Sequence, residues 1–153
     1  TTSTRRAAAA APGATRRTGG RSGRQCAVAA IDAKQIDGRW LCTTHGGRKL
    51  TELELFSWAR EAADRGAGEI LFTSMDHDGT KAGYADEVYR KLHSMLDIPV
   101  IASGGAGSIE DIRRVLDEGC ADAALAASIF HYNPLPITEL KKALAASNIN
   151  VRL

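Results

Sequence analysis

The sequence has 153 residues, enough for one domain with a substantial core and too few for two ordinary ones. Hydrophobic residues make up 44% and charged residues 25%, as in ordinary globular proteins, and we expect no membrane partner because no apolar run is long enough to span a bilayer. The net charge of +2 is unevenly distributed, because the first 25 residues contain six arginines and no acid. Residues 26–153 therefore carry 14 basic and 18 acidic side chains. Since this part is mildly acidic, we do not expect nucleic acid as a partner.

Three cysteines, odd in number, show neither a CxxC motif nor clustering with histidine: Cys26, Cys42 and Cys120. This spacing indicates reduced thiols in a cytoplasmic protein and no structural zinc. The four histidines also lack the spacing of metal ligands, so we expect neither a metal nor a cofactor.

Residues 1–24 contain Thr, Ser, Arg, Ala, Gly and one Pro, with no aliphatic side chain larger than Ala. Such a segment buries too little apolar surface to offset the entropy of ordering, so we expect disorder there and a single domain over residues 25–153. The Arg-rich, acid-free composition is also typical of a transit peptide, which would direct the protein to a plastid. A nucleic-acid-binding arm is a third interpretation, although the segment has no aromatic residue to stack on bases.

The first predicted strand, residues 26–31, consists of small and β-branched side chains and ends on Asp32. Turn signals, one Asp-Gly and one Gly-Gly pair, then predict a short hairpin within residues 35–49. The sequence TELE at 51–54 has the spacing of a capping box and predicts the start of a helix that ends near Gly66.

Residues 69–74, EILFTS, form an apolar run that predicts a buried strand with Glu69 and Thr73 on the same face. Asp76 and Asp78 follow in the sequence MDHDG, just past the carboxyl end of this strand. In parallel α/β folds, chemistry collects at that end of the strands. A solvated Asp-Gly turn is the alternative interpretation.

The rest of the chain alternates between helix and strand. We expect a helix over 86–96, a strand over 99–102, a helix capped by Ser108 and ending near 118, a strand over 121–126 and a last helix over 137–146. Four successive strand–helix units predict a parallel sheet with right-handed crossovers. Because the strands are short and rich in Ala, we expect half of an eight-stranded (βα)8 TIM barrel rather than a large open sheet.

Two Gly- or Ser-rich turns, residues 103–107 and 127–128, directly precede predicted helix starts. Backbone N–H groups in such turns bind phosphate, and in barrels this site lies in the loops after the last two strands. Tight packing without a ligand is the alternative reason for the glycines.

Asp32 and Asp78 lie at the same predicted end of the sheet, so they are candidates for a general acid and base whose pKa values are pushed apart. A loop or helix cap is the alternative role for Asp32. Glu69 begins its strand and enters the barrel from the opposite end, where a buried acid needs partners that the predicted half-barrel lacks.

Six segments together resemble one family, the cyclase subunit of imidazole glycerol phosphate synthase from histidine biosynthesis. They are AIDAK at 30–34, THGGRK at 44–49, GAGEIL at 66–71, TSMDHDGTK at 73–81, IASGGAG at 101–107 and AALAASIFH at 123–131. The resemblance runs from about residue 25 to 153 and covers only the carboxyl-terminal half of that family's (βα)8 barrel.

The resemblance implies a bisphosphorylated ribotide substrate, the phosphoribulosyl-formimino intermediate of the pathway. It implies a glutamine amidotransferase subunit as the partner that supplies ammonia. The implied products are imidazole glycerol phosphate and aminoimidazole carboxamide ribotide.

The resemblance also implies roles for single residues. Asp32 matches the family's catalytic aspartate, Asp78 matches a supporting acid at the same mouth, and Glu69 matches a charged position where ammonia enters. The positions that match one substrate-phosphate site are Thr73, Gly79, Ser103, Gly104, Gly105, Ala127 and Ser128. The family's other catalytic aspartate and other phosphate site belong to the first half of the barrel.

Two other functions remain open. The sister ribotide isomerase of the same pathway shares the Asp-Gly-Thr and Gly-Gly features, although AIDAK and THGGRK favour the cyclase. The second is a phosphate-binding half-barrel without catalysis.

A half-barrel leaves two strand edges, residues 26–31 and 123–126, and an apolar inner face without a cover. We therefore expect the chain to self-associate, as a dimer in which one edge pairs with the other edge of the partner.

Overall fold

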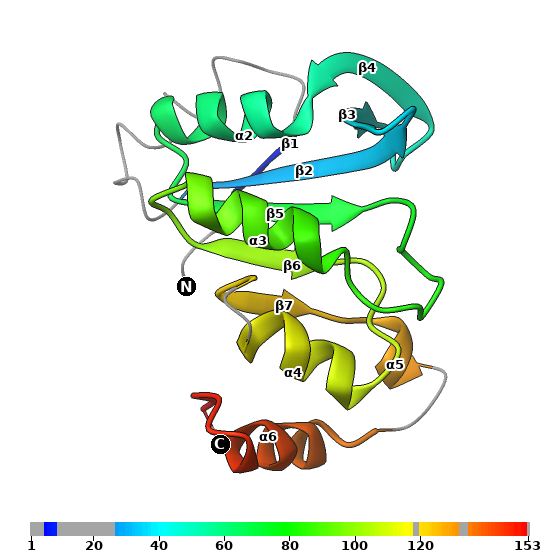
Figure 1. Ribbon diagram of the computed structural model, residues 1–153, viewed down its shortest axis with the longest axis vertical. Coiled ribbons are helices and arrows are strands. Elements are labelled where there is room, and N and C mark those ends of the chain that lie inside the picture. Colours follow the sequence, from blue (N-terminus) through cyan, green and yellow to red (C-terminus); the bar gives the residue numbers. More distant parts are fainter. Residues whose placement is uncertain (1–4, 9–26, 118–119, 132–134, 153) are drawn as a thin grey trace.

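The computed structural model places the strands in one sheet and helices α2, α3 and α4 over one of its faces (Figure 1). The residues it describes are 5–8, 27–117, 120–131 and 135–152. Among them, no helix is long and apolar enough to cross a membrane.

Four strands run parallel and form the centre of the sheet, in the order β2-β5-β6-β7. They are β2 (Ala27–Ile36), β5 (Glu69–Ser74), β6 (Val100–Ser103) and β7 (Ala123–Leu125). Each is connected to the next by a segment that contains a helix, so the mostly parallel sheet agrees with the predicted partial (βα)8 barrel.

The helices largely follow the prediction. They are α2 (Leu55–Asp64), α3 (Asp86–Met95), α4 (Ile109–Asp117), the short α5 (Ser128–His131) and α6 (Ile137–Ala146). The Oγ atom of Ser108 accepts a hydrogen bond from the N–H of Asp111 at 3.1 Å, so the predicted cap of α4 is confirmed.

The predicted hairpin is also present, formed by β3 (Arg39–Thr44) and β4 (Lys49–Glu54). Its pairing corrects the predicted end of the first strand. Strand β2 continues for four residues past Asp32, because the stretch from Asp32 to Ile36 pairs antiparallel with β3. Asp32 therefore lies within a strand rather than at its end.

The predicted capping box at residues 51–54 is wrong. The hydroxyl of Thr51 donates to the carbonyl oxygen of Cys42 at 2.8 Å, which helps to hold this segment against β3 as strand β4. The helix instead starts one residue after Glu54, whose carboxylate accepts from the N–H of Ser57 at 2.9 Å. An acidic cap suits the positive end of a helix.

Strand β1 (Arg5–Ala8) lies within the segment for which we expect disorder. It pairs parallel with Ala27 to Ala30 of β2, so the expectation of disorder is wrong for these four residues. The other residues of 1–24 lie outside the described residues, and the boundary at residue 25 stays a prediction.

The same pairing corrects the predicted open edge at residues 26–31. Strand β1 pairs with the first part of β2, and β3 pairs with the part from Asp32 onward. Strand β7 pairs with β6 alone within the described residues, so the sheet edge predicted at residues 123–126 remains exposed there.

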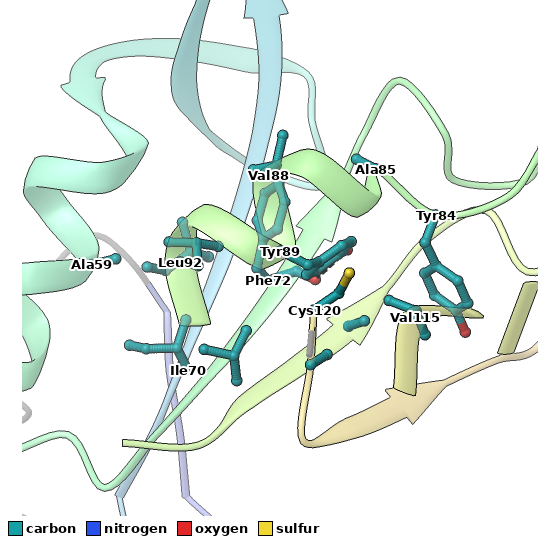
Figure 2. Packing of buried hydrophobic residues seen from close by; sticks show 14 of the residues in the cluster. Ala59, Ile70, Phe72, Tyr84, Ala85, Val88, Tyr89, Leu92, Val115 and Cys120 are labelled. Atoms are coloured by element: carbon teal, nitrogen blue, oxygen red, sulfur yellow. Dashed lines mark hydrogen bonds between the residues drawn. The ribbon is translucent and has the colours of Figure 1, made fainter. Parts of the chain in front are cut away.

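A chain of aromatic rings runs through the core between the sheet and its helices. The ring centroid of Phe72 lies 5.7 Å from Trp40 of the hairpin and 5.1 Å from Tyr89 of α3. Tyr89 in turn meets Tyr84 edge-on at 6.1 Å. Tyr89 and its helix neighbours Val88 and Leu92 are buried in the same cluster as Phe72 (Figure 2). Edge-to-face and tilted ring pairs of this kind add to the stability from burial alone.

The hydroxyl of Tyr89 lies between the carboxyl ends of β5 and β6. Its oxygen is 3.0 Å from the carbonyl oxygen of Phe72 and 2.6 Å from that of Ser103, and it accepts from the N–H of Ser103 at 3.1 Å. Burial raises the pKa of Tyr89, because the charged phenolate would lose its hydration there. The neutral hydroxyl thus joins two strand ends.

We expect Tyr89→Phe to lower the free energy of unfolding by about 1–3 kcal/mol, because it leaves buried backbone groups without their partner. Tyr84→Phe is the matched control, since the Tyr84 hydroxyl donates to a single strand end, the carbonyl oxygen of Leu125 at 2.9 Å. Urea denaturation followed by circular dichroism measures both. Equal losses in the two variants would contradict the role given to Tyr89.

Candidate functional site

A pocket lies at the carboxyl ends of β5, β6 and β7, where the loops after these strands meet. Seven residues predicted for the site line it: Asp78, Gly79, Ser103, Gly104, Gly105, Ala127 and Ser128. The sequence did not point to four further lining residues: Lys81, Ala106, Leu125 and Ala126. Lys81 could have been suspected because it follows the Asp-Gly-Thr sequence.

Asp32 and Thr73 are not among the residues that line the pocket, but they lie at the same level of the sheet. Asp32 pairs with Thr73 in register, Thr73 pairs with Ser103, and Ser103 pairs with Leu125. Residues that pair in a parallel sheet share a face. Since the alternate residues Ile31 and Phe72 are buried under the helices, this row lies on the opposite, inner face.

The two aspartates after β5 have different surroundings. The carboxylate of Asp76 accepts from the N–H of Gln35 at 2.7 Å, so it joins this loop to the end of β2. The N–H of Asp78 donates to the carbonyl oxygen of Ser74 at 2.9 Å, and Asp78 is exposed at the pocket. Asp78 is therefore the better placed of the two to meet a ligand.

The glycines of the turn after β6 allow two loops to touch backbone to backbone. A Cβ atom on Gly105 would lie 2.0 Å from the carbonyl oxygen of Gly83, and one on Gly107 would lie 2.2 Å from that of Lys81. The N–H of Gly83 donates to the carbonyl oxygen of Gly105 at 2.9 Å. Tight packing, the alternative considered for these glycines, is thus a real constraint, and it brings the two loops together beside the pocket.

The two amides just before α4 already have an anionic partner. One carboxylate oxygen of Asp111 accepts from the N–H groups of Gly107 and Ser108, at 3.1 and 2.9 Å, and from the Ser108 hydroxyl at 2.9 Å. These groups at the helix start therefore serve the fold, which leaves the earlier turn at Gly104 and Gly105 as the part that faces the pocket.

Glu69 begins β5 at the end of the sheet away from the pocket, as the sequence predicts. Its side chain is half-buried and shares the inner face with Leu71 and Thr73.

Cys42 is fully buried on β3, and burial raises the pKa of its thiol to about 12, with smaller contributions from the nearby charges of Glu54 and Asp32. It is therefore protonated and unreactive at neutral pH. Within the part of the chain that the structure describes, no group of three or more His, Cys, Asp or Glu side chains is arranged to hold a metal ion.

Comparison with known proteins identifies a family that this chain matches. The model of a family described as "Histidine biosynthesis protein" matches residues 2–136. The chain belongs to this family. The match also includes most of the amino-terminal segment, which we did not expect to resemble the family.

Individual relatives show which proteins within this family the chain resembles. The chain is 57% identical over 131 residues to imidazole glycerol phosphate synthase subunit HisF of Flavobacterium johnsoniae, an alignment that covers 86% of this chain and 52% of that protein. The proteins of the same name from Phocaeicola vulgatus and Dehalococcoides mccartyi are 56% and 55% identical, with the same coverage. The predicted resemblance is confirmed, and these names favour the cyclase over the sister isomerase.

The chain spans about half the length of these curated relatives. This agrees with a sheet in which four parallel strands, β2, β5, β6 and β7, are connected by segments that contain helices, where a whole barrel has eight such strands.

We expect Gly105→Ala to destabilise the protein more than Gly38→Ala. Both glycines have positive φ angles, +111° and +78°, but a Cβ on Gly38 would have no atom within 4 Å. Gly38→Ala should cost about 1–2 kcal/mol for the left-handed backbone alone. Gly105→Ala should cost about 1–3 kcal/mol more, because the new methyl group overlaps the Gly83 carbonyl.

Thermal unfolding of both variants measures this difference. If the two glycine variants unfold at the same temperature, the close contact between the two loops does not contribute to stability.

Proposed function

We propose that this chain is the half of an imidazole glycerol phosphate synthase cyclase subunit that carries one phosphate site and one catalytic aspartate. The observation that carries this proposal is the pocket at the strand ends, lined by seven of the residues predicted for the site. Family membership and the HisF relatives support it. In this proposal the reaction takes place in the cytoplasm, and the bacterial relatives lend no support to a plastid.

In the proposed reaction, ammonia from a glutamine amidotransferase subunit reacts with the bisphosphorylated ribotide, the formimino intermediate. Closure of the imidazole ring then gives imidazole glycerol phosphate and releases aminoimidazole carboxamide ribotide. Such a reaction moves protons at several steps, so it needs a general acid and a general base near the reacting carbon and nitrogen atoms.

Asp32 is the proposed acid–base group. It lies on the inner face at the level of Thr73 and Ser103, so a substrate whose phosphate is bound in the pocket can extend over it. Asp78 is the proposed supporting acid, from the pocket itself. Two carboxyl groups near one substrate can serve as general acid and general base in turn.

The phosphate is proposed to bind between the two turns at residues 103–105 and 127–128, with Gly79 beside them. Backbone N–H groups and the hydroxyls of Ser103 and Ser128, which line the pocket, are the proposed donors, with Thr73 at the same level of the sheet beside them. Glu69, at the far end of the inner face, is the proposed ammonia entrance, and the amidotransferase would bind at that end.

A phosphate-binding half-barrel without catalysis is the second candidate function. It needs only the pocket at the ends of β5, β6 and β7, which the described residues form by themselves. Turnover, rather than binding, separates the two functions.

We expect turnover when this chain is combined with the amino-terminal half of the Flavobacterium johnsoniae relative, the cyclase substrate and an ammonium salt. Asp32→Asn should lower the rate by roughly 100-fold or more, the usual contribution of a positioned proton-transfer group. A continuous assay of product formation measures the rate.

Asp76→Asn is the matched control, because its side-chain oxygen can still accept from the Gln35 N–H and it lies outside the pocket. It should leave the rate within a few-fold of the parent. No turnover by the combined halves would favour the second function, and full turnover by Asp32→Asn would remove Asp32 from the chemistry.

We also propose that the chain self-associates. In the part of the chain that the structure describes, the surfaces left for association include the outer edge of β7 and the inner face, where Ala30, Leu71 and Ile101 are half-buried. Burying several hundred Å² of apolar surface at about 25 cal/mol per Å² favours association before its entropic costs.

Sedimentation at micromolar concentration should therefore show a concentration-dependent dimer. Ala123→Lys places a charge on the exposed edge strand, at a position exposed to solvent, and should shift the equilibrium toward monomer. A parent chain that sediments as a monomer at all concentrations would contradict the proposal.

A further inference from the structure

One cation lines the pocket and has no role in the proposal so far. Among the described residues that line it, Asp78 and Lys81 are the charged ones, and the others are Gly, Ala, Ser and Leu. Lys81 is therefore the only basic side chain among the described residues that line this pocket.

The backbone of Lys81 is held in an unusual conformation. Its φ angle is +59°, in the left-handed region that side chains other than Gly, Asn and Asp rarely adopt. Its carbonyl oxygen would lie 2.2 Å from a Cβ on Gly107, so the peptide is packed closely against the turn after β6. A glycine would adopt this conformation without strain. The backbone therefore does not explain why a lysine stands here.

The chemistry of the proposed phosphate ligand explains why residue 81 is a lysine. A phosphate ester at neutral pH carries up to two negative charges, and the neighbouring Asp78 carboxylate would repel it. Backbone N–H groups contribute dipoles but no net charge. A lysine ammonium supplies a positive charge and three hydrogen-bond donors, which offsets the carboxylate.

We propose that Lys81 is the cationic contact for the phosphate group in this pocket, aimed there by a left-handed backbone packed against Gly107. It is a substrate-binding and specificity-determining residue, which selects an anionic phosphate ester over a neutral ligand next to Asp78. This inference rests on the phosphate site of the proposed function. It adds the positively charged group that balances the negative charge of the bound phosphate.

Titration with inorganic phosphate by calorimetry, at low and at high sodium chloride, tests this on the full chain. Lys81→Gln should weaken binding about tenfold at low salt, the usual effect of removing one hydrogen bond to a charged group. It should also flatten the dependence on salt, because salt screens an exposed ammonium. Lys142→Gln is the matched control: it removes the same charge at an exposed position of α6 outside the pocket, and should bind phosphate like the parent.

Lys81→Gly separates binding from folding. It should bind phosphate as weakly as Lys81→Gln, yet its midpoint of thermal unfolding should rise, because glycine relieves the left-handed backbone. A lysine with a merely structural role would not produce this opposite pair of changes.

The outcomes that overturn the inference are distinct. Phosphate binding by both Lys81 variants at the parent's affinity and salt dependence would remove Lys81 from the site and leave the site itself intact. Loss of cooperative unfolding in both variants would make Lys81 structural. A parent chain that binds no phosphate, even at millimolar concentration, would remove the phosphate site of the proposed function and Lys81 with it.

Discussion

The carboxyl ends of β5 and β6 are joined by one buried hydroxyl group, that of Tyr89. Both loops of the candidate site start from these two strand ends, after Ser74 and Ser103. The position of one loop relative to the other therefore depends on a side chain of α3, and Tyr84 extends the same arrangement to the end of β7. A buried hydroxyl in contact with several backbone groups is costly to lose, so the frame of the pocket is rigid where the strands end.

The pocket also depends on a close backbone contact between the loop after β5 and the loop after β6. The two loops approach so closely that a Cβ on Gly105 would lie 2.0 Å from the carbonyl oxygen of Gly83, so Gly105 tolerates no side chain. Phosphate binding and tight packing, two alternative reasons for the glycines, are thus compatible: packing brings the loops together, and the hollow beside the contact is the candidate site. The residues just before α4 contribute less than their position suggests, because Asp111 already accepts from the N–H groups of Gly107 and Ser108.

The two edges of the parallel sheet differ. Strand β2 is paired along most of its length by β1 and by the hairpin. Strand β7 pairs only with β6 among the described residues, and its Leu125 retains 46% of its accessible surface. The inner face is only half-buried, while the helix-covered face contains fully buried side chains such as Ile31 and Phe72. A barrel needs its inner face closed, and the described strands, in a chain that spans about half of its relatives, form only part of such a barrel.

The sequence by itself determined what depends on short-range periodicity. Alternation in residues 69–74 identified β5 and its two faces, and apolar spacing placed α3 and α6 within one residue of their ends. The family motifs identified seven residues that line the pocket. Only the tertiary structure decided the rest, because pairing partners are distant in sequence. Residues 51–54 became a strand against β3, Asp32 came to lie inside β2, and Arg5–Ala8 paired with it. Lys81 became part of the pocket because its backbone packs on Gly107, a contact between two loops that no local pattern encodes.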